Sequence, residues 1–326
     1  MVKNQKITDE YAIYESDVMD FIPTLGDNSI DFSVYSPPFL GLYNYSSSER
    51  DFSNCDSKEQ GLQQYEFFVK EKARVTKPGR ITAVHCTDLM NKDGSQYDYP
   101  HEIEEIHKRH GFKRMNKITV WKEPLKVRMR TMVRSLMHKL IVEDSTETFT
   151  AMPDYILIFK KNGVNEVPVT HPKGLEYYAG ATPMLPEMTD KYGTWEEITN
   201  KYKGWKDPKT NKMSHIIWQR YASSVWDDIR IDNVLKYKDS KDEDDEKHVH
   251  PLQLDVIDRL CTLYSNPGEV VFTPFMGVGS EVYGAVSLGR KAIGVELKDT
   301  YYRQAVKNLL DVKMRFIADA QLELKL

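Results

Sequence analysis

Short strand and helix patterns alternate near both ends of the chain, and this alternation most constrains the fold. Near the N-terminus, strand patterns at 11–14, 30–35 and 81–84 are separated by helical patterns at 17–25 and 62–73. Near the C-terminus, helical patterns at 254–261 and 280–288 alternate with strand patterns at 269–272 and 292–296. Strand–helix–strand alternation predicts a parallel, doubly wound α/β sheet with helices on both faces.

The middle of the chain divides into a continuation of this pattern and an irregular segment. A helix near 100–110 and strands near 117–121 and 155–159 continue the alternation. From 161 to 224 the sequence is irregular and rich in Pro, Gly, Tyr, Lys and Trp, which is typical of an insertion. We therefore expect three parts, at residues 1–160, 161–224 and 225–326.

A glycine-rich turn, Thr273-Pro-Phe-Met-Gly277-Val-Gly279-Ser280, joins the strand near 269–272 to the helix that follows. Glycines let the backbone approach a ligand closely, and a helix N-terminus favours a negative group. Glu296 ends the next strand, about 20 residues after the first glycine, where a carboxylate binds ribose hydroxyls. A turn without a ligand and a nicotinamide site are the alternatives. The third glycine of the dinucleotide fingerprint, however, would fall at Val282.

This turn resembles the Asp-Pro-Phe-x-Gly-x-Gly-Ser/Thr loop of amino-methyltransferases, with Thr273 in place of the usual Asp. The resemblance implies S-adenosyl-L-methionine as the cofactor. It also implies cofactor-binding roles for Thr273, Pro274, Phe275, Gly277, Gly279, Ser280 and Glu296.

A second short loop, Ser36-Pro37-Pro38-Phe39, directly follows the strand at 30–35. It resembles the Pro-Pro motif of DNA methyltransferases that act on exocyclic amino groups, and the resemblance implies the following chemistry. The nitrogen of such a group is a poor nucleophile because its lone pair is delocalised. The Ser36 side chain and the Pro37 carbonyl can accept both amino hydrogens, and the prolines hold those acceptors rigidly. The Phe39 ring can stack on an extruded base, and positioning then supplies most of the rate. A simple strand stop is the structural alternative.

The loop resembles the Asp/Asn/Ser-Pro-Pro-aromatic motif of DNA amino-methyltransferases, which implies catalytic roles for Ser36, Pro37, Pro38 and Phe39. Two further segments extend the resemblance. Asp17, in Tyr14-Glu-Ser-Asp17, would hold the cofactor's adenine amino group, and His250-Pro251-Leu-Gln253 resembles the opening of the helix before the cofactor loop. Having the catalytic loop early and the cofactor loop late is the motif order of the circularly permuted β group.

The net charge of the chain conceals a strongly basic segment. The total is -4, from 45 Lys and Arg against 49 Asp and Glu, which argues against non-specific coating of nucleic acid. Between Lys108 and Lys139, however, eleven Lys and Arg accompany one acidic residue, Glu123. Charge of one sign at this density predicts phosphate contacts, with a solvated face as the alternative. The predicted DNA-binding residues are Lys122, Lys126, Arg128, Arg130 and Arg134.

Other features exclude several classes of protein. Three cysteines at no metal-like spacing, Cys55, Cys86 and Cys261, predict no metal site. The acidic run at 239–246 is expected to be a solvated loop. No apolar run approaches the roughly 20 residues that cross a bilayer, and the N-terminus has no signal-peptide pattern. We therefore expect a cytoplasmic protein that is not associated with a membrane.

Together these patterns predict a Rossmann-like, circularly permuted α/β fold of the adenosylmethionine-dependent methyltransferases, with an inserted target-recognition region. The expected activity is methyl transfer to a flipped base in double-stranded DNA, as part of a restriction-modification system. A homodimer is a possible assembly. Ser before Pro-Pro favours N4 of cytosine, and N6 of adenine is the alternative. A catalytically silent nucleic-acid-binding subunit and an NAD-dependent dehydrogenase are the rival classes.

Overall fold

The computed structural model describes residues 2–40, 55, 57–91, 95–131, 136–180, 190–191, 193–202, 211–240, 251–310 and 312. In this part of the chain one nine-stranded sheet has the order β1-β2-β11-β10-β3-β4-β8-β7-β9. Its strands are β1 (Asn4–Ile7), β2 (Tyr11–Glu15), β3 (Ile30–Tyr35), β4 (Thr76–Cys86), β7 (Phe112–Val120), β8 (Asp154–Lys161), β9 (Val225–Trp226), β10 (Val270–Thr273) and β11 (Lys291–Glu296). A separate short ribbon joins β5 (Leu89–Met90) to β6 (Gln96–Tyr97).

The directions of the strands confirm the doubly wound core and correct the expectation of an all-parallel sheet. Strands β2, β11, β10, β3 and β4 are parallel, whereas β8 runs antiparallel to both β4 and β7. β1 also pairs antiparallel with β2. The physical reason lies in the connections, because the segment after β7 leaves and re-enters the sheet at the same edge, as in a hairpin.

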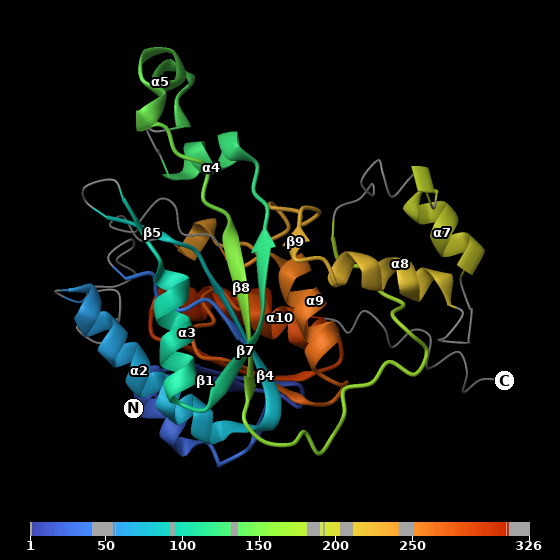
Figure 1. Ribbon diagram of the computed structural model, residues 1–326. Helices are drawn as coiled ribbons and strands as arrows, with labels where there is room; N and C mark the ends of the chain where they lie inside the picture. The colour runs from blue at the N-terminus through green and yellow to red at the C-terminus, as the bar shows by residue number, and fades with distance from the viewer. Residues whose placement is uncertain are drawn as a thin grey trace.

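Helices cover both faces of the sheet (Figure 1). One face carries α1 (Val18–Phe21) with the 3-10 turn η1 (Ile22–Thr24), α2 (Lys58–Val75) and α3 (Tyr99–Arg109). The other carries α9 (Leu254–Tyr264), α10 (Ser280–Ser287) and α11 (Asp299–Asn308). β8 shows how one strand serves both layers, since Ile156 and Ile158 join the second core whereas Leu157 and Phe159 join the first. Burial on both faces explains its continuous apolar sequence.

Several elements lie outside the sequence-predicted core. Between β7 and β8 the chain forms α4 (Pro124–Thr131), α5 (His138–Glu143) and η3 (Ser145–Glu147), which project beyond the ends of both strands (Figure 1). The irregular segment contains α7 (Trp195–Tyr202) and α8 (Lys212–Tyr221), and η4 (Lys238–Ser240) follows β9. Among the described residues, no helix is long and apolar enough to span a membrane.

Local chemistry sets the limits of α3. The Asp98 side chain accepts the His101 N–H at 3.0 Å, Pro100 lies in the first turn, and Gly111 follows the helix with φ +83°.

On the buried face of α3, the His107 ring stacks on Phe159 with centroids 4.1 Å apart. Burial lowers the pKa of His107 to about 3, so this side chain is neutral. It fills the core and does not act as an acid or base.

A lysine is buried in the same layer. The Lys72 side chain of α2 is fully buried; its ammonium hydrogen-bonds Thr82 Oγ1 and lies 4.8 Å from the centroid of the Phe112 ring. No ion pair involves Lys72 in the described part of the chain. Burial, and to a smaller extent the Lys161 charge, holds the pKa of Lys72 well below its usual range.

We expect Lys72→Met to remove a pH dependence of the free energy of unfolding. The unfolded chain holds the Lys72 proton up to the ordinary pKa, whereas the native state releases it at lower pH. Wild-type stability therefore rises from neutral pH towards pH 10, by about 1.4 kcal/mol per unit of pKa depression. Urea unfolding at pH 7 and pH 9.5 measures this rise, and Lys70→Met, on the exposed side of α2, is the matched control. Equal pH dependence in the wild type and Lys72→Met would show that the native state binds this proton normally.

Candidate active site

The carboxyl ends of β10 and β3 lie side by side at the centre of the sheet. The two strands pair in parallel through Val271–Phe32 and Phe272–Ser33. After β10 the chain turns through α10 to β11 on one side, whereas after β3 it turns through α2 to β4 on the other. In open α/β sheets, ligands bind outside the strand ends at such a reversal. The two loops found in the sequence are therefore neighbours. The ring of Tyr35, which precedes the Ser36 loop, packs against the ring of Phe275 with centroids 5.8 Å apart.

The glycine-rich turn has the backbone that its sequence requires. Gly277 and Gly279 have φ of +52° and +90°, a region that favours glycine. The Gly279 N–H donates to the Met276 carbonyl at 2.8 Å, and Gly279 is the N-cap of α10. A Cβ at Gly279 would lie 3.1 Å from the Ala305 Cβ, whereas one at Gly277 would meet nothing within 4 Å.

The structure brings Glu296 onto this turn. Its Oε2 accepts the Gly277 N–H at 2.8 Å and its Oε1 accepts the Lys298 N–H at 2.9 Å. The carboxylate at the end of β11 therefore braces the first glycine and lies beside the loop. This is the pairing of acidic residue and turn that the sequence predicts.

The donor set around the turn fits the expected adenosyl cofactor. Thr273 Oγ1 and Ser280 Oγ are buried and lack a hydrogen-bond partner among the described residues. A bound polar ligand would satisfy these hydroxyls, and Glu296 can accept from ribose hydroxyls. Burial and the neighbouring Glu296 charge raise the pKa of Glu281 to about 8, so Glu281 adds little negative charge there at neutral pH.

The other predicted cofactor residues lie along the same edge, with one exception. Asp17 follows β2, which pairs with β11 through Glu15–Glu296, and the Asp17 side chain accepts the Met19 N–H at 2.8 Å as the N-cap of α1. Gln253 is buried at the N-terminus of α9, and Pro251 precedes it half-buried. His250 lies outside the described residues.

Side chains from two other elements hold the Ser36-Pro37-Pro38-Phe39 loop. The Tyr99 hydroxyl of α3 donates to the Pro38 carbonyl at 2.9 Å. The Phe39 ring lies edge-on to His85, with centroids 6.4 Å apart, and 6.5 Å from the Tyr99 ring. Ser36 Oγ lies 2.8 Å from His85 Nδ1. The loop is therefore anchored at its first, third and fourth residues.

Sequence reasoning missed His85 and the charged pair behind it. His85 Nε2 lies 2.8 Å from Asp154 Oδ2, and Lys122 Nζ lies 2.5 Å from Asp154 Oδ1. Burial alone would raise the pKa of Asp154, but Lys122 and His85 outweigh it and hold that pKa below its usual range. A polar residue within the apolar run Ile81-Thr-Ala-Val-His85 was the available signal. No motif connects it with Asp154.

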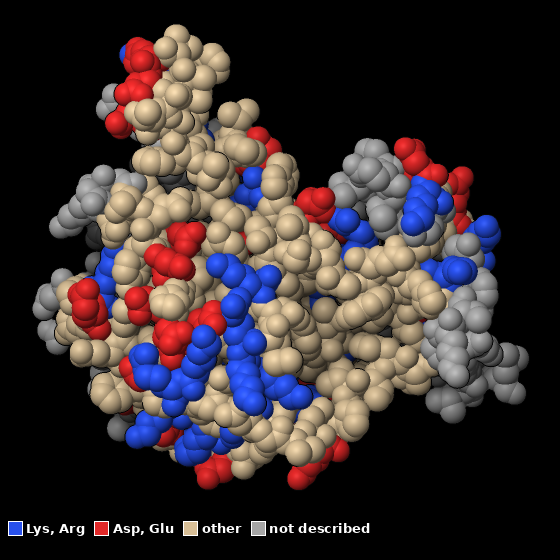
Figure 2. All heavy atoms as spheres, viewed as in Figure 1, with Lys and Arg blue, Asp and Glu red and all other residues tan. Residues whose placement is uncertain are grey.

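The structure divides the basic segment into two parts. Lys and Arg gather over β7 on the face shown in Figure 2, and the exposed residues there include Lys113, Arg114 and Lys117. The predicted DNA-binding residues instead follow β7, at the edge of the sheet that carries the catalytic loop. Lys126 is exposed and lies 3.3 Å from Asp232 Oδ2. Arg128 is half-buried, the Arg130 side chain is not described, and Arg134 lies outside the described residues.

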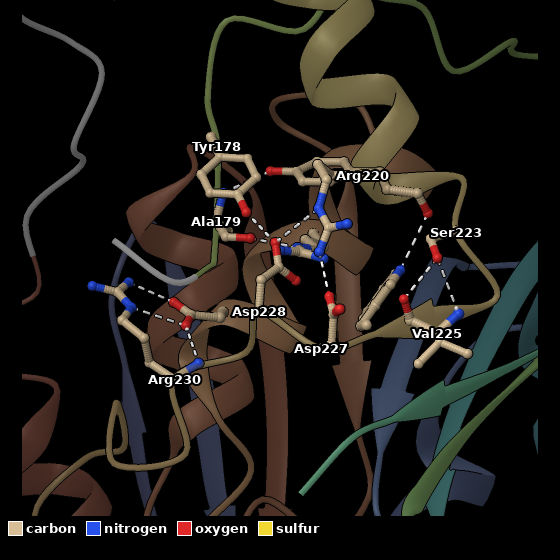
Figure 3. Close-up of polar contacts among 12 residues, drawn as sticks. Tyr178, Ala179, Arg220, Ser223, Val225, Asp227, Asp228 and Arg230 are labelled. Atoms are coloured by element: carbon tan, nitrogen blue, oxygen red, sulfur yellow. Dashed lines mark hydrogen bonds and ion pairs between the residues drawn. The ribbon is translucent and has the colours of Figure 1, made fainter. Parts of the chain in front are cut away.

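A polar network around Asp228 links the irregular segment to the catalytic part, because Asp228 contacts both Tyr178 and Arg220 of that segment. Figure 3 shows Tyr178, Arg220 and Asp228 directed towards one another. The fully buried Arg259 guanidinium of α9 lies 2.7 Å from Asp228 Oδ2 and stacks over the rings of Tyr221 and Trp226. The segment's tyrosines therefore share one charge network with the core helix α9.

Solved structures share this fold. TTHA0409 of Thermus thermophilus has 19% identity and a TM-score of 0.57, covering 93% of this chain and 94% of that one. PvuII DNA methyltransferase (cytosine-N4-specific) has 14% identity and a TM-score of 0.58, covering 98% and 94%. These likenesses show the fold, the Rossmann-like α/β fold of adenosylmethionine-dependent methyltransferases.

A sequence model of the N6/N4 methyltransferase family, described as DNA methylase, matches residues 30–307, so the chain belongs to that family. Type II methyltransferase M.MthZI of Methanothermobacter thermautotrophicus is 23% identical over 299 residues, or 85% of this chain and 70% of the relative. M.BglII of Bacillus subtilis is 23% identical over 291 residues, or 89% and 66%. The chain thus spans 70% and 66% of these relatives' lengths. It is a DNA methyltransferase that uses S-adenosyl-L-methionine and acts on an exocyclic amino nitrogen.

We expect Gly279→Ala to destabilise the protein more than Gly277→Ala does. Both substitutions force alanine to positive φ, at a cost of about 1–2 kcal/mol, but only Gly279→Ala adds a contact with Ala305. Urea unfolding compares the two variants, and calorimetric titration with S-adenosyl-L-methionine reports their affinity for the cofactor. Equal destabilisation of the two variants would show that α11, which carries Ala305, shifts away from the new methyl group without a cost in stability.

Proposed function

We propose that this chain methylates N4 of a cytosine extruded from double-stranded DNA, with N6 of adenine as the alternative. The observation that carries the proposal is the adjacency of the Ser36–Phe39 loop and the glycine-rich turn at the reversal between β3 and β10. Chemistry on a base requires the base to leave the stack, and the adjacency of the two loops supports a site in which proposed amino-group acceptors lie beside a proposed cofactor loop.

Each residue of the catalytic loop has a proposed role. S-adenosyl-L-methionine, when bound, supplies an electrophilic methyl group on a positively charged sulfur. Ser36 Oγ and the Pro37 carbonyl accept the amino hydrogens and orient the nitrogen lone pair for in-line attack. Tyr99 holds the Pro38 carbonyl, and the Phe39 ring stacks on the base. Positioning of this kind supplies rate without a covalent nucleophile.

Cofactor contacts are proposed for the residues along the edge formed by β2, β11 and β10. Glu296 would bind the ribose hydroxyls, and Asp17 the adenine amino group. Buried hydroxyls at Thr273 and Ser280 support a polar ligand at the turn. The remaining proposed contacts are Pro251, Gln253, Pro274, Phe275, Gly277 and Gly279, together with His250.

The choice of base depends on Ser36. In the family this chain resembles, Ser before Pro-Pro accompanies N4-cytosine modification most often, whereas Asp or Asn favours N6-adenine. The alternative has support among the relatives, because DNA adenine methyltransferase YhdJ of Escherichia coli is 27% identical over 132 residues, 40% of this chain. A labelled-methyl assay on unmethylated DNA, followed by nucleoside mass spectrometry, identifies the product. N6-methyladenine would overturn the cytosine assignment. Cofactor binding without transfer would indicate a silent subunit.

We expect Pro37→Ala to lower the single-turnover rate of methyl transfer by on the order of 100-fold while cofactor affinity changes little. The substitution frees the backbone that holds the acceptors, and it does not alter the glycine-rich turn. Pro23→Ala, at an exposed proline in η1, is the matched control. A parallel loss of cofactor affinity in Pro37→Ala would contradict the separation of the two loops.

The DNA surface is proposed to combine the projecting segment between β7 and β8 with the insertion at 161–224. The first supplies Lys122, Lys126, Arg128, Arg130 and Arg134 at the edge that carries the catalytic loop. The second is proposed to read base edges as the target-recognition part, between catalytic parts at 1–160 and 225–326. Light scattering in solution would distinguish a homodimer from a monomer.

We expect Lys126→Ala combined with Arg128→Ala to weaken DNA binding and to reduce the salt slope. Each lost phosphate contact lowers the slope of log K against log salt by roughly 1. Fluorescence anisotropy with duplex DNA at several salt concentrations measures both effects. Lys113→Ala, at the opposite end of β7, is the control. An unchanged slope in the double variant would place the phosphate contacts elsewhere.

A further inference from the structure

A chain of polar contacts leads from the catalytic loop across the sheet. It begins at Ser36 Oγ, 2.8 Å from His85 Nδ1, and continues from His85 Nε2 to Asp154 Oδ2 at 2.8 Å. It ends where Lys122 Nζ lies 2.5 Å from Asp154 Oδ1. These residues lie at or next to the ends of β3, β4, β8 and β7, which lie side by side in that order in the sheet.

We propose that His85, oriented by Asp154, is a positioning residue that fixes the Ser36 hydroxyl as a hydrogen-bond acceptor for the target amino group. This inference rests on the proposed function and deepens it. It explains how a serine can take the role that an aspartate has in related catalytic loops.

The assignment of protons follows from what each group can donate. His85 Nε2 lies 2.8 Å from Asp154 Oδ2 without the geometry of a hydrogen bond, and a carboxylate at that distance favours a protonated Nε2 because a bare nitrogen would be repelled by the ionised oxygen. The Lys122 ammonium beside Asp154 favours that ionised form. With the proton on Nε2, Nδ1 is bare and can only accept from the Ser36 hydroxyl. The one Ser36 hydrogen is thereby directed at His85, and the oxygen lone pairs are left for the base.

The polarity of Ser36 matters because a hydroxyl can either donate or accept. An aspartate in this position could only accept, whereas an unconstrained serine could turn its hydrogen towards the base. The target amino groups of cytosine and adenine are donors, but the carbonyls of thymine and guanine at the corresponding positions are acceptors. A Ser36 fixed as an acceptor therefore favours amino bases over keto bases.

The surroundings of His85 restrict movement of its ring. Asp154 is buried, the His85 side chain is 12% exposed, and the Phe39 ring lies edge-on to the imidazole at an interplanar angle of 87°. β4 pairs with β8 through His85–Ile156, two residues from Asp154. The strand pairing thus holds the two side chains in register, and the loop's own aromatic residue packs against the imidazole.

Three variants separate positioning from a general structural effect. His85→Ala removes the acceptor, and we expect the single-turnover methylation rate to fall by on the order of 100-fold. His85→Asn keeps an acceptor oxygen near the position of Nδ1, and its rate should recover to within about tenfold of the wild type. Asp154→Asn can reverse the imidazole tautomer, so its rate should fall at least as far as that of His85→Ala.

The measurements use the full chain, S-adenosyl-L-methionine and amplified, unmethylated DNA. Cofactor affinity by calorimetry should be unchanged in all three variants. ¹⁵N-histidine NMR of the wild type should show the His85 imidazole with Nδ1 unprotonated and Nε2 protonated. The His85 signal is assigned as the one that is missing from the spectrum of His85→Asn. His110→Ala, which removes a different histidine–carboxylate contact, the 3.0 Å pair with Glu66, should retain the wild-type rate.

The outcomes distinguish this inference from the proposed function. If the wild type transfers no methyl group to DNA, the proposed function fails. If the wild type is active and His85→Ala matches its rate, or if Nδ1 carries the proton, the positioning role fails and the proposed function stands. Equal losses in His85→Ala and His85→Asn would also overturn the role, because the restored acceptor would then have no effect.

Discussion

The parallel pairing of β10 with β3 is the contact on which the site depends. It joins strands from opposite ends of the chain, and their carboxyl ends carry the glycine-rich turn and the Ser36 loop. Because the chain turns away from the two strands in opposite directions, the described crossover helices α10 and α2 lead to opposite sides of this point. The apolar residues of both strands are buried between helical layers, so register and site geometry are set by the same packing. A shift of register would separate the cofactor loop from the catalytic loop.

The second half of the site depends on the antiparallel strands β8 and β7. They bring Asp154 and Lys122 to the edge where β4 ends, just after His85, and where β3 ends before Ser36. The segment that projects between these two strands carries the basic residues proposed to contact DNA. Asp228, which contacts Tyr178 and Arg220 of the irregular segment, also pairs with the buried Arg259 and so links that segment to α9. Binding, positioning and proposed recognition therefore share one scaffold.

Most of the core could be predicted from the sequence because its signals are local. The strand at Ile30–Tyr35 has the predicted bounds, and β11 and α10 lie within one residue of theirs. The antiparallel direction of β8 could not be predicted, since an apolar run buried on both faces has no preferred direction. Helices α4, α5, α7 and α8 were missed within polar, irregular sequence. Lys122 was predicted to contact phosphate, and the structure pairs it with Asp154, a contact that the sequence did not predict.

By itself the sequence determined the fold class, the two loops and the cofactor that they imply, because glycines at positive φ and paired prolines are requirements of the local backbone. It also determined the order of the loops along the chain. Only the tertiary structure decided that Ser36 meets His85, that Asp154 lies beside His85 and that Arg259 contacts the insertion. Those contacts join residues far apart in the chain, and strand order and register alone bring them within hydrogen-bond distance.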